Sequence, residues 1–237
     1  MTIAMRAGVA AIAALALGIG LSGCGSDTSG EAKTADTSAT AESTATSESA
    51  PSSAAPTTPP PAASPGMTLD QYVAENGIVA TPVLQGDPGA PTITLPLPEG
   101  WEVAGDRAPA GAYDALIYTA PPPSPTPPTI VAFVTKLTGD VEPARVLEYA
   151  PNETRNLPGY KGAETGKQSS LGGFEATQIG GFYTKDGIER LVAQKTTVIP
   201  TEGGVFVLKI IADGTEDLAM PMMDATAAID DQTTITP

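Results

Sequence analysis

Residues 174–212 read FEATQIGGFYTKDGIERLVAQKTTVIPTEGGVFVLKIIA and give the clearest indication of the fold class. Two turn sequences divide it into three apolar runs, which predicts consecutive strands at 174–184, 188–199 and 204–212. Asp186-Gly187 is a strong two-residue hairpin signal, and residues 200–203 supply the second turn. Strands joined by such short turns form an antiparallel meander.

Further strands are expected on the N-terminal side of this meander, where short apolar runs are broken by Gly and Pro. They span residues 93–97, 115–119 and 130–136. Residues 130–134 are apolar on both alternations, which suits a central strand covered on both faces. Between the last two strands, the proline-rich run 121–128 cannot donate ladder hydrogen bonds, so we expect a connector in polyproline II geometry.

Helices are expected before and after these strands. Thr68 to Gln71 fits a capping box that begins a helix, and residues 142–149 form a second helix that Pro151 ends or restarts. A closing helix runs from about Thr215 to Asp230, bent or restarted near Pro221. The pattern predicts an α+β fold, an antiparallel β-sheet with helices packed on its faces, formed by a single domain over residues 67–237.

The N-terminus has the pattern of a lipoprotein signal peptide at residues 1–23. Arg6 precedes an uncharged apolar run that is too short to span a membrane comfortably, since a spanning helix needs roughly 20 strongly apolar residues. The run ends in Leu21-Ser22-Gly23-Cys24, the cleavage motif of signal peptidase II, and Cys24 is the chain's one cysteine. We expect Cys24 to carry S-diacylglycerol and an N-acyl chain, which hold the protein to the extracytoplasmic side of the cell membrane.

Residues 24–66 comprise the lipidated Cys24 and a segment of Ser, Thr, Ala, Pro and acidic residues. This composition offers almost no large apolar group to bury, so it predicts a disordered linker. A flexible chain of this length reaches roughly 35–40 Å, which suits a spacer that lifts the domain off the membrane.

Composition excludes several classes of function. The chain has no His, and lipid consumes Cys24, so Ser-His-Asp and Cys-His catalysis and His- or Cys-based zinc sites are unavailable. The balance of 12 Lys plus Arg against 27 Asp plus Glu repels phosphate backbones and argues against nucleic acid. We therefore expect a protein that is not an enzyme, with no metal and no cofactor.

The roles of one aromatic residue and of one group of carboxylates each allow two interpretations. Trp101, the one tryptophan, is either a core anchor beneath a turn or a ligand-stacking platform. Asp213, Glu216 and Asp217 gather at a helix start, where capping is favoured over a Ca²⁺ site because the spacing of a calcium loop is missing.

The chain resembles the mycobacterial LpqN lipoproteins over nearly all of residues 67–237. The blocks that carry the resemblance are Gly86 to Ile93, Leu95-Pro96 with Pro98 and Trp101, Lys136 to Asp140, Ala150 to Glu153, Asn156 to Gly159, Leu171 to Phe174, Val192 to Thr196, and Ile229-Asp230 with Gln232 to Pro237. The resemblance implies a PsbP-like α/β/α sandwich in an actinobacterial envelope protein linked to cell-envelope lipids and MmpL-type exporters. It carries over no functional residues.

Two functions remain open. In the first, the domain binds an envelope lipid or glycolipid, or assists its export, through an apolar groove lined by Met222, Met223 and Ile229 of the last helix with the strand residues Phe206 and Leu208. In the second, it is a scaffold that binds envelope proteins such as MmpL-type exporters and has no ligand of its own.

Overall fold

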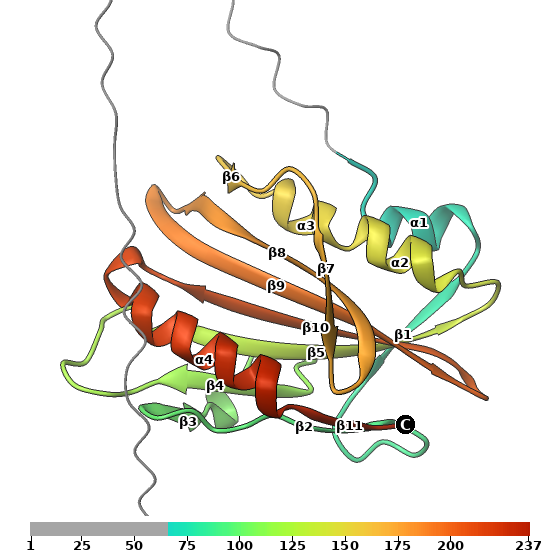
Figure 1. Cartoon of the computed structure of the whole chain (residues 1–237), viewed down its shortest axis with the longest axis horizontal. Coiled ribbons are helices and arrows are strands. Elements are labelled where there is room, and N and C mark those ends of the chain that lie inside the picture. Colours follow the sequence, from blue (N-terminus) through green and yellow to red (C-terminus); the bar gives the residue numbers. More distant parts are fainter. Residues whose placement is uncertain (1–65) are drawn as a thin grey trace, which may run out of the picture. The chain divides into compact units, whose positions relative to one another are not determined.

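A nine-stranded antiparallel sheet organises residues 66–237, the part of the chain that the computed structural model describes (Figure 1). The predicted signal peptide, Cys24 and the linker up to residue 65 lie outside the described residues. The nine strands are β1 Val79–Val83, β3 Trp101–Val103, β4 Asp114–Tyr118, β5 Thr129–Thr138, β6 Lys161–Gly162, β7 Lys167–Leu171, β8 Phe174–Lys185, β9 Ile188–Thr201 and β10 Gly204–Gly214. The main path of the sheet runs β3-β4-β5-β10-β9-β8-β6.

The predicted meander is confirmed as β8, β9 and β10, the three longest strands of the sheet. Its first hairpin pairs Lys185 with Ile188, and the two residues between them, Asp186 and Gly187, have φ of 53° and 77°. Positive φ at both central positions is what a type I′ turn requires, and Asp-Gly supplies it at low steric cost. β5 pairs with the free side of β10, so the predicted central strand lies in the middle of the sheet.

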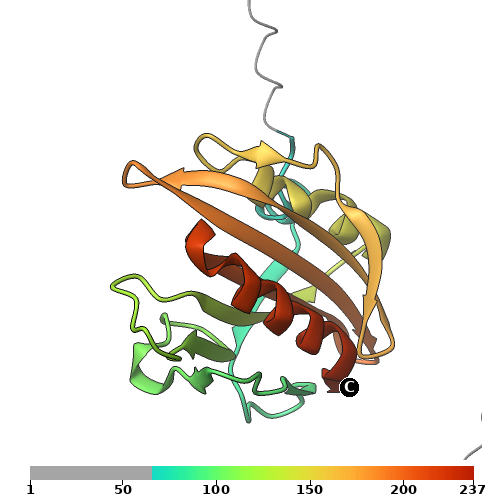
Figure 2. The ribbon, with the colours of Figure 1, turned by 60° about the vertical axis from the view of Figure 1, so that its left-hand side comes forward.

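Helices cover both faces of this sheet (Figures 1 and 2). The helices are α1 Leu69–Glu75, α2 Pro143–Tyr149, α3 Pro151–Arg155 and α4 Ala219–Gln232. Alternate residues of β10 point to opposite sides, so Leu208 packs in the core cluster with α4 and Val207 in the cluster with α1 and α2. The predicted α+β class, an antiparallel sheet with helices on its faces, is confirmed.

The helix ends follow local rules with two differences from expectation. The capping box is confirmed, since the Gln71 N–H donates to Thr68 Oγ1 at 3.3 Å and the Thr68 N–H donates to Gln71 Oε1 at 2.9 Å. The closing helix begins at Ala219, after a 3₁₀ turn at Glu216–Leu218, rather than at Thr215. Pro221 therefore falls in the first turn, where its missing N–H has no intrahelical partner to lose, and it neither bends nor restarts the helix.

Two short strands complete the structure beside α4. β2 Thr92–Thr94 pairs with β11 Thr234–Thr236 in a separate antiparallel ladder, which fastens the C-terminal residues to the first part of the domain. Within residues 66–237, every helix is too short or too polar to cross a bilayer.

Candidate functional site

A hollow of about 390 Å³ lies between α4 and the sheet, within the size range of small-molecule sites. Figure 2 shows α4 lying along one face of the sheet, in roughly the same direction as the long strands β8 and β9. Its walls come from β8, β9, β10, α4 and the segment before β7; the residues that line it include Gly180, Ala193, Ile210, Ala212, Ile229 and Ala163.

The floor of the hollow is a row of small residues that runs directly across three strands. Gly180 of β8 pairs with Ala193 of β9, and Ala193 pairs with Ala212 of β10. The next row on this face, Gln178, Lys195 and Ile210, also lines the hollow, and only the row after it places Leu208 opposite Thr197 in the filled core. Because large side chains normally fill the space between a helix and a sheet, the small row leaves room beneath α4.

Charged groups stand at the edge of this apolar space. Lys195 of β9 is only 8% exposed, and its ammonium lies 2.5 Å from Asp230 Oδ1 of α4. Lys167, at the start of β7, also lines the hollow and is exposed. The site therefore joins an apolar floor to two cations and one carboxylate.

The five residues predicted to line a groove are placed differently from one another. Met222, Ile229, Phe206 and Leu208 belong to one core cluster, with exposures of 3%, 2%, 2% and 0%. Met223 lies on the outer side of α4 and is 59% exposed. Ile229 is the one of the five that lines the hollow between α4 and the sheet.

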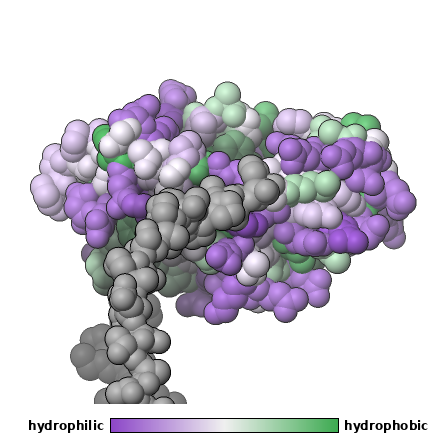
Figure 3. All heavy atoms as spheres, turned by 90° about the horizontal axis from the view of Figure 1, so that it is seen from above, coloured by the Kyte–Doolittle hydropathy of each residue, from purple (hydrophilic) through white to green (hydrophobic). Residues whose placement is uncertain are grey.

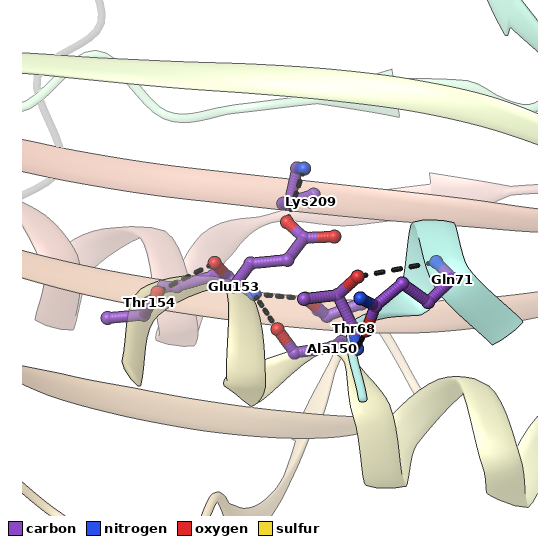
Figure 4. A network of polar contacts seen from close by, with 8 residues as sticks. Thr68, Gln71, Ala150, Glu153, Thr154 and Lys209 are labelled. Atoms are coloured by element: carbon purple, nitrogen blue, oxygen red, sulfur yellow. Dashed lines mark hydrogen bonds and ion pairs between the residues drawn. The ribbon is translucent and has the colours of Figure 1, made fainter. Parts of the chain in front are cut away.

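A buried polar network pins α3 to the opposite face of the sheet. The Gln194 amide donates to the Ala150 carbonyl at 2.9 Å and to Thr196 Oγ1 at 3.1 Å, while the Thr154 hydroxyl donates to Gln194 Oε1 at 2.8 Å. Figure 4 shows the adjoining ion pair, in which Glu153 of α3 reaches Lys209 of β10 at 2.7 Å. These contacts satisfy the polar groups that β9 buries on this face, so we interpret the network as structural.

A second polar cluster on that face joins Tyr183 of β8, Arg190 of β9 and Asp213 of β10. The Tyr183 hydroxyl donates to Asp213 Oδ2 at 2.5 Å, and the Arg190 guanidinium pairs with Asp213 Oδ1. Burial, together with the hydrogen bond to Asp213, raises the pKa of Tyr183 to about 12. The Asp213 carboxylate is thus bound by a guanidinium and a phenol. Among the described residues, no group of three carboxylates is close enough together to hold a metal ion.

The raised pKa of Tyr183 makes stability depend on pH in the alkaline range. The folded protein keeps the phenol proton to higher pH than the unfolded chain does, so this stabilisation is complete below pH 10 and is lost as pH rises through about 12. Between those values, we expect the free energy of unfolding to fall by about 1–2 kcal/mol more in the wild type than in Tyr183→Phe. Urea unfolding of both proteins across this range measures the difference, and parallel curves would contradict it.

Trp101 has the geometry of a core residue. It is 4% exposed and meets Tyr118 edge to face, with ring centroids 5.5 Å apart. Of its two interpretations, the buried and already partnered ring favours the core anchor.

Sequence reasoning missed the residues that make the hollow, Gly180, Ala193 and Lys195. Two of them belong to the block Val192 to Thr196, whose alternation sends Gln194 and Thr196 to α3 and Ala193 and Lys195 toward α4. The available signal was a lysine in the middle of the predicted strand 188–199, where a charged side chain is seldom placed unless it has a partner.

The sheet covered by helices on both faces defines an α/β/α sandwich domain, and comparison with known proteins gives its family. A family model described as "Probable lipoprotein LpqN" matches residues 65–236. The chain belongs to this LpqN lipoprotein family, as its sequence blocks indicate.

A relative at the level of sequence and a solved structure extend the match. Lipoprotein LpqN of Mycobacterium tuberculosis is 52% identical over 235 residues, which cover 98% of this chain and 100% of that protein. The crystal structure of LpqN "involved in cell envelope biogenesis of Mycobacterium tuberculosis" is 50% identical with a TM-score of 0.68; the match covers 73% of this chain and 99% of that one. A chain of this extent therefore folds on its own in the relative.

Proposed function

We propose that this protein is a non-enzymatic envelope lipoprotein, anchored through Cys24 on the extracytoplasmic side of the membrane, whose domain binds an envelope lipid or glycolipid. The observation that carries the proposal is the hollow under α4, about 390 Å³ in volume, with its floor of Gly180, Ala193 and Ala212. An apolar space with a few polar groups at its edge suits an amphiphile whose chain enters and whose head stays outside.

The protein's family gives a second line of support for this proposal. The relative from Mycobacterium tuberculosis is described as involved in cell envelope biogenesis, and a lipoprotein anchored through Cys24 would lie in that envelope. The predicted linker, with its expected reach of roughly 35–40 Å, would let the domain reach lipids and lipid exporters such as those of the MmpL type.

A scaffold without a ligand is the second candidate, and the outer side of α4 favours it. Met220 and Met223 lie there three residues apart, 65% and 59% exposed, and methionine surfaces adapt to many partner shapes. Seen from the side of β6 and α1–α3, the surface is mainly hydrophilic with scattered hydrophobic residues (Figure 3). We therefore place the partner contact of this second candidate, such as one with an MmpL-type exporter, on α4.

Filling the hollow tests the lipid proposal. Ala193→Phe places a ring on its floor, so we expect the isolated domain, residues 66–237, to lose about tenfold or more in affinity for a fluorescent fatty acid or a trehalose glycolipid. Fluorescence titration measures the affinity, and thermal unfolding checks that the variant is folded.

The matched control is Ala227→Phe, because Ala227 is exposed on α4 and does not line the hollow. It should bind lipid as the wild type does. Equal uptake by Ala193→Phe would place the ligand elsewhere. If the wild-type domain takes up neither probe, and carries no lipid from its own host in native mass spectrometry, the scaffold becomes the remaining candidate function.

A further inference from the structure

The hollow under α4 is electrostatically unlike the rest of the protein. The whole chain carries 27 acidic residues against 12 Lys plus Arg, a formal charge of −15. The residues that line this hollow nevertheless include two lysines, Lys167 and Lys195, and one carboxylate, Asp230. The site is locally positive in an acidic chain.

Lys195 is the central group, because it lies on the sheet side of the hollow and is almost fully buried. Its side chain is 9% exposed, whereas that of Asp230, its partner at 2.5 Å, is 41% exposed. An ammonium can donate three hydrogen bonds, and Asp230 is the acceptor that residues 66–237 supply to it. The donors of Lys195 that Asp230 does not take can bind an additional acceptor that enters from the hollow.

Asp230 can share Lys195 with such an acceptor at low cost. Its carboxylate is partly hydrated, so it loses less than a buried carboxylate would when another anion shares Lys195. Lys167 lines the same hollow from the start of β7 and forms no ion pair within the described part of the chain. Two cations thus line the hollow beside its apolar floor.

We infer that the hollow selects a single-chain lipid with an anionic head, a carboxylate or a phosphate. The alkyl chain lies on the floor of Gly180, Ala193 and Ala212, and the head binds Lys195 and Lys167, sharing Lys195 with Asp230. This inference rests on the proposed lipid-binding function and adds the charge of the ligand to it.

Isothermal titration of the isolated domain, residues 66–237, with dodecanoate, dodecyl phosphate and dodecyl maltoside tests the inference, because the three probes share one chain and differ in the head. We expect both anions to bind at least tenfold more tightly than the neutral maltoside. Comparing dodecanoate with dodecyl phosphate then identifies which anionic head fits better.

Charge variants sharpen the test. Lys195→Met keeps the length of the stem and should weaken dodecanoate binding about tenfold or more, with a further loss when Lys167→Met is added. Asp230→Asn removes the competing carboxylate and should strengthen dodecanoate binding severalfold. Lys185→Met is the matched control, since Lys185 lies at the exposed β8–β9 turn and does not line the hollow.

The outcomes separate the inference from the function on which it rests. Maltoside binding as tight as dodecanoate binding, unchanged in Lys195→Met and Asp230→Asn, would overturn the anionic head and leave lipid binding standing. Failure of all three probes to bind would overturn the lipid-binding proposal itself. Asp230→Asn leaves Lys195 in place, so an unchanged affinity in this variant counts against the inference even if Lys195→Met unfolds.

Discussion

Cys24→Ser is expected to abolish the lipid anchor, so that the protein is either shed into the medium or left as an unlipidated precursor. Serine has no thiol to form the thioether with diacylglycerol, and signal peptidase II then lacks its lipidated substrate. The S-linked chains and the N-acyl chain are then both missing. A precursor keeps only its uncleaved apolar segment to hold it to the membrane, and a cleaved protein keeps no anchor. Partitioning in Triton X-114 should move the variant from the detergent phase to the aqueous phase or leave it as precursor.

The control for this experiment is Ser22→Ala, which keeps a small residue at the cleavage motif and leaves Cys24 in place. It should be processed and retained as the wild type is. Retention of mature Cys24→Ser protein in the detergent phase would show that something other than lipid on Cys24 anchors the chain.

The second large effect is expected within α4, where two adjacent methionines have opposite environments. Met222 is 3% exposed and Met223 is 59% exposed. Met222→Asp places a carboxylate without a partner in the core and removes packing, so we expect a loss of about 3–5 kcal/mol in the free energy of unfolding. For a domain of this size, that is a fall of roughly 10–15 °C in melting temperature.

Met223→Asp is the matched partner of that variant. Its carboxylate stays hydrated, so we expect a change within about 0.5 kcal/mol and unchanged lipid uptake, because Met223 does not line the hollow. Thermal and urea unfolding of both variants measures the contrast. Similar losses in the two proteins would mean that α4 is rotated from the position described.

Local sequence signals predicted much of the fold. Asp186-Gly187 sets the register of the central hairpin, since both residues adopt the positive φ that the turn needs. Thr68 and Gln71 close the capping box within four residues of each other. These signals work because the interactions that fix them join residues close in the sequence.

Strands whose partners are remote in sequence were not predicted. β1 and β3 are short, and β1 includes a proline. Each forms only because a strand of the sheet offers it an unpaired stretch of ladder, the C-terminal part of β5 for β1 and β4 for β3. β11 likewise depends on β2, more than a hundred residues earlier. The amino acids of such segments show weak propensity, and tertiary pairing decides their structure.

The family, the α+β class and the expected anchor at Cys24 can be read from contiguous motifs, because each motif lies within a short stretch of the chain. The face that each side chain takes depends instead on how the strands pair. Alternation along β9 separates Lys195 from Gln194, and cross-strand register brings Gly180, Ala193 and Ala212 into one row beneath α4. A one-residue shift in register would send each of these side chains to the other face, so the hollow exists only once the whole sheet has paired.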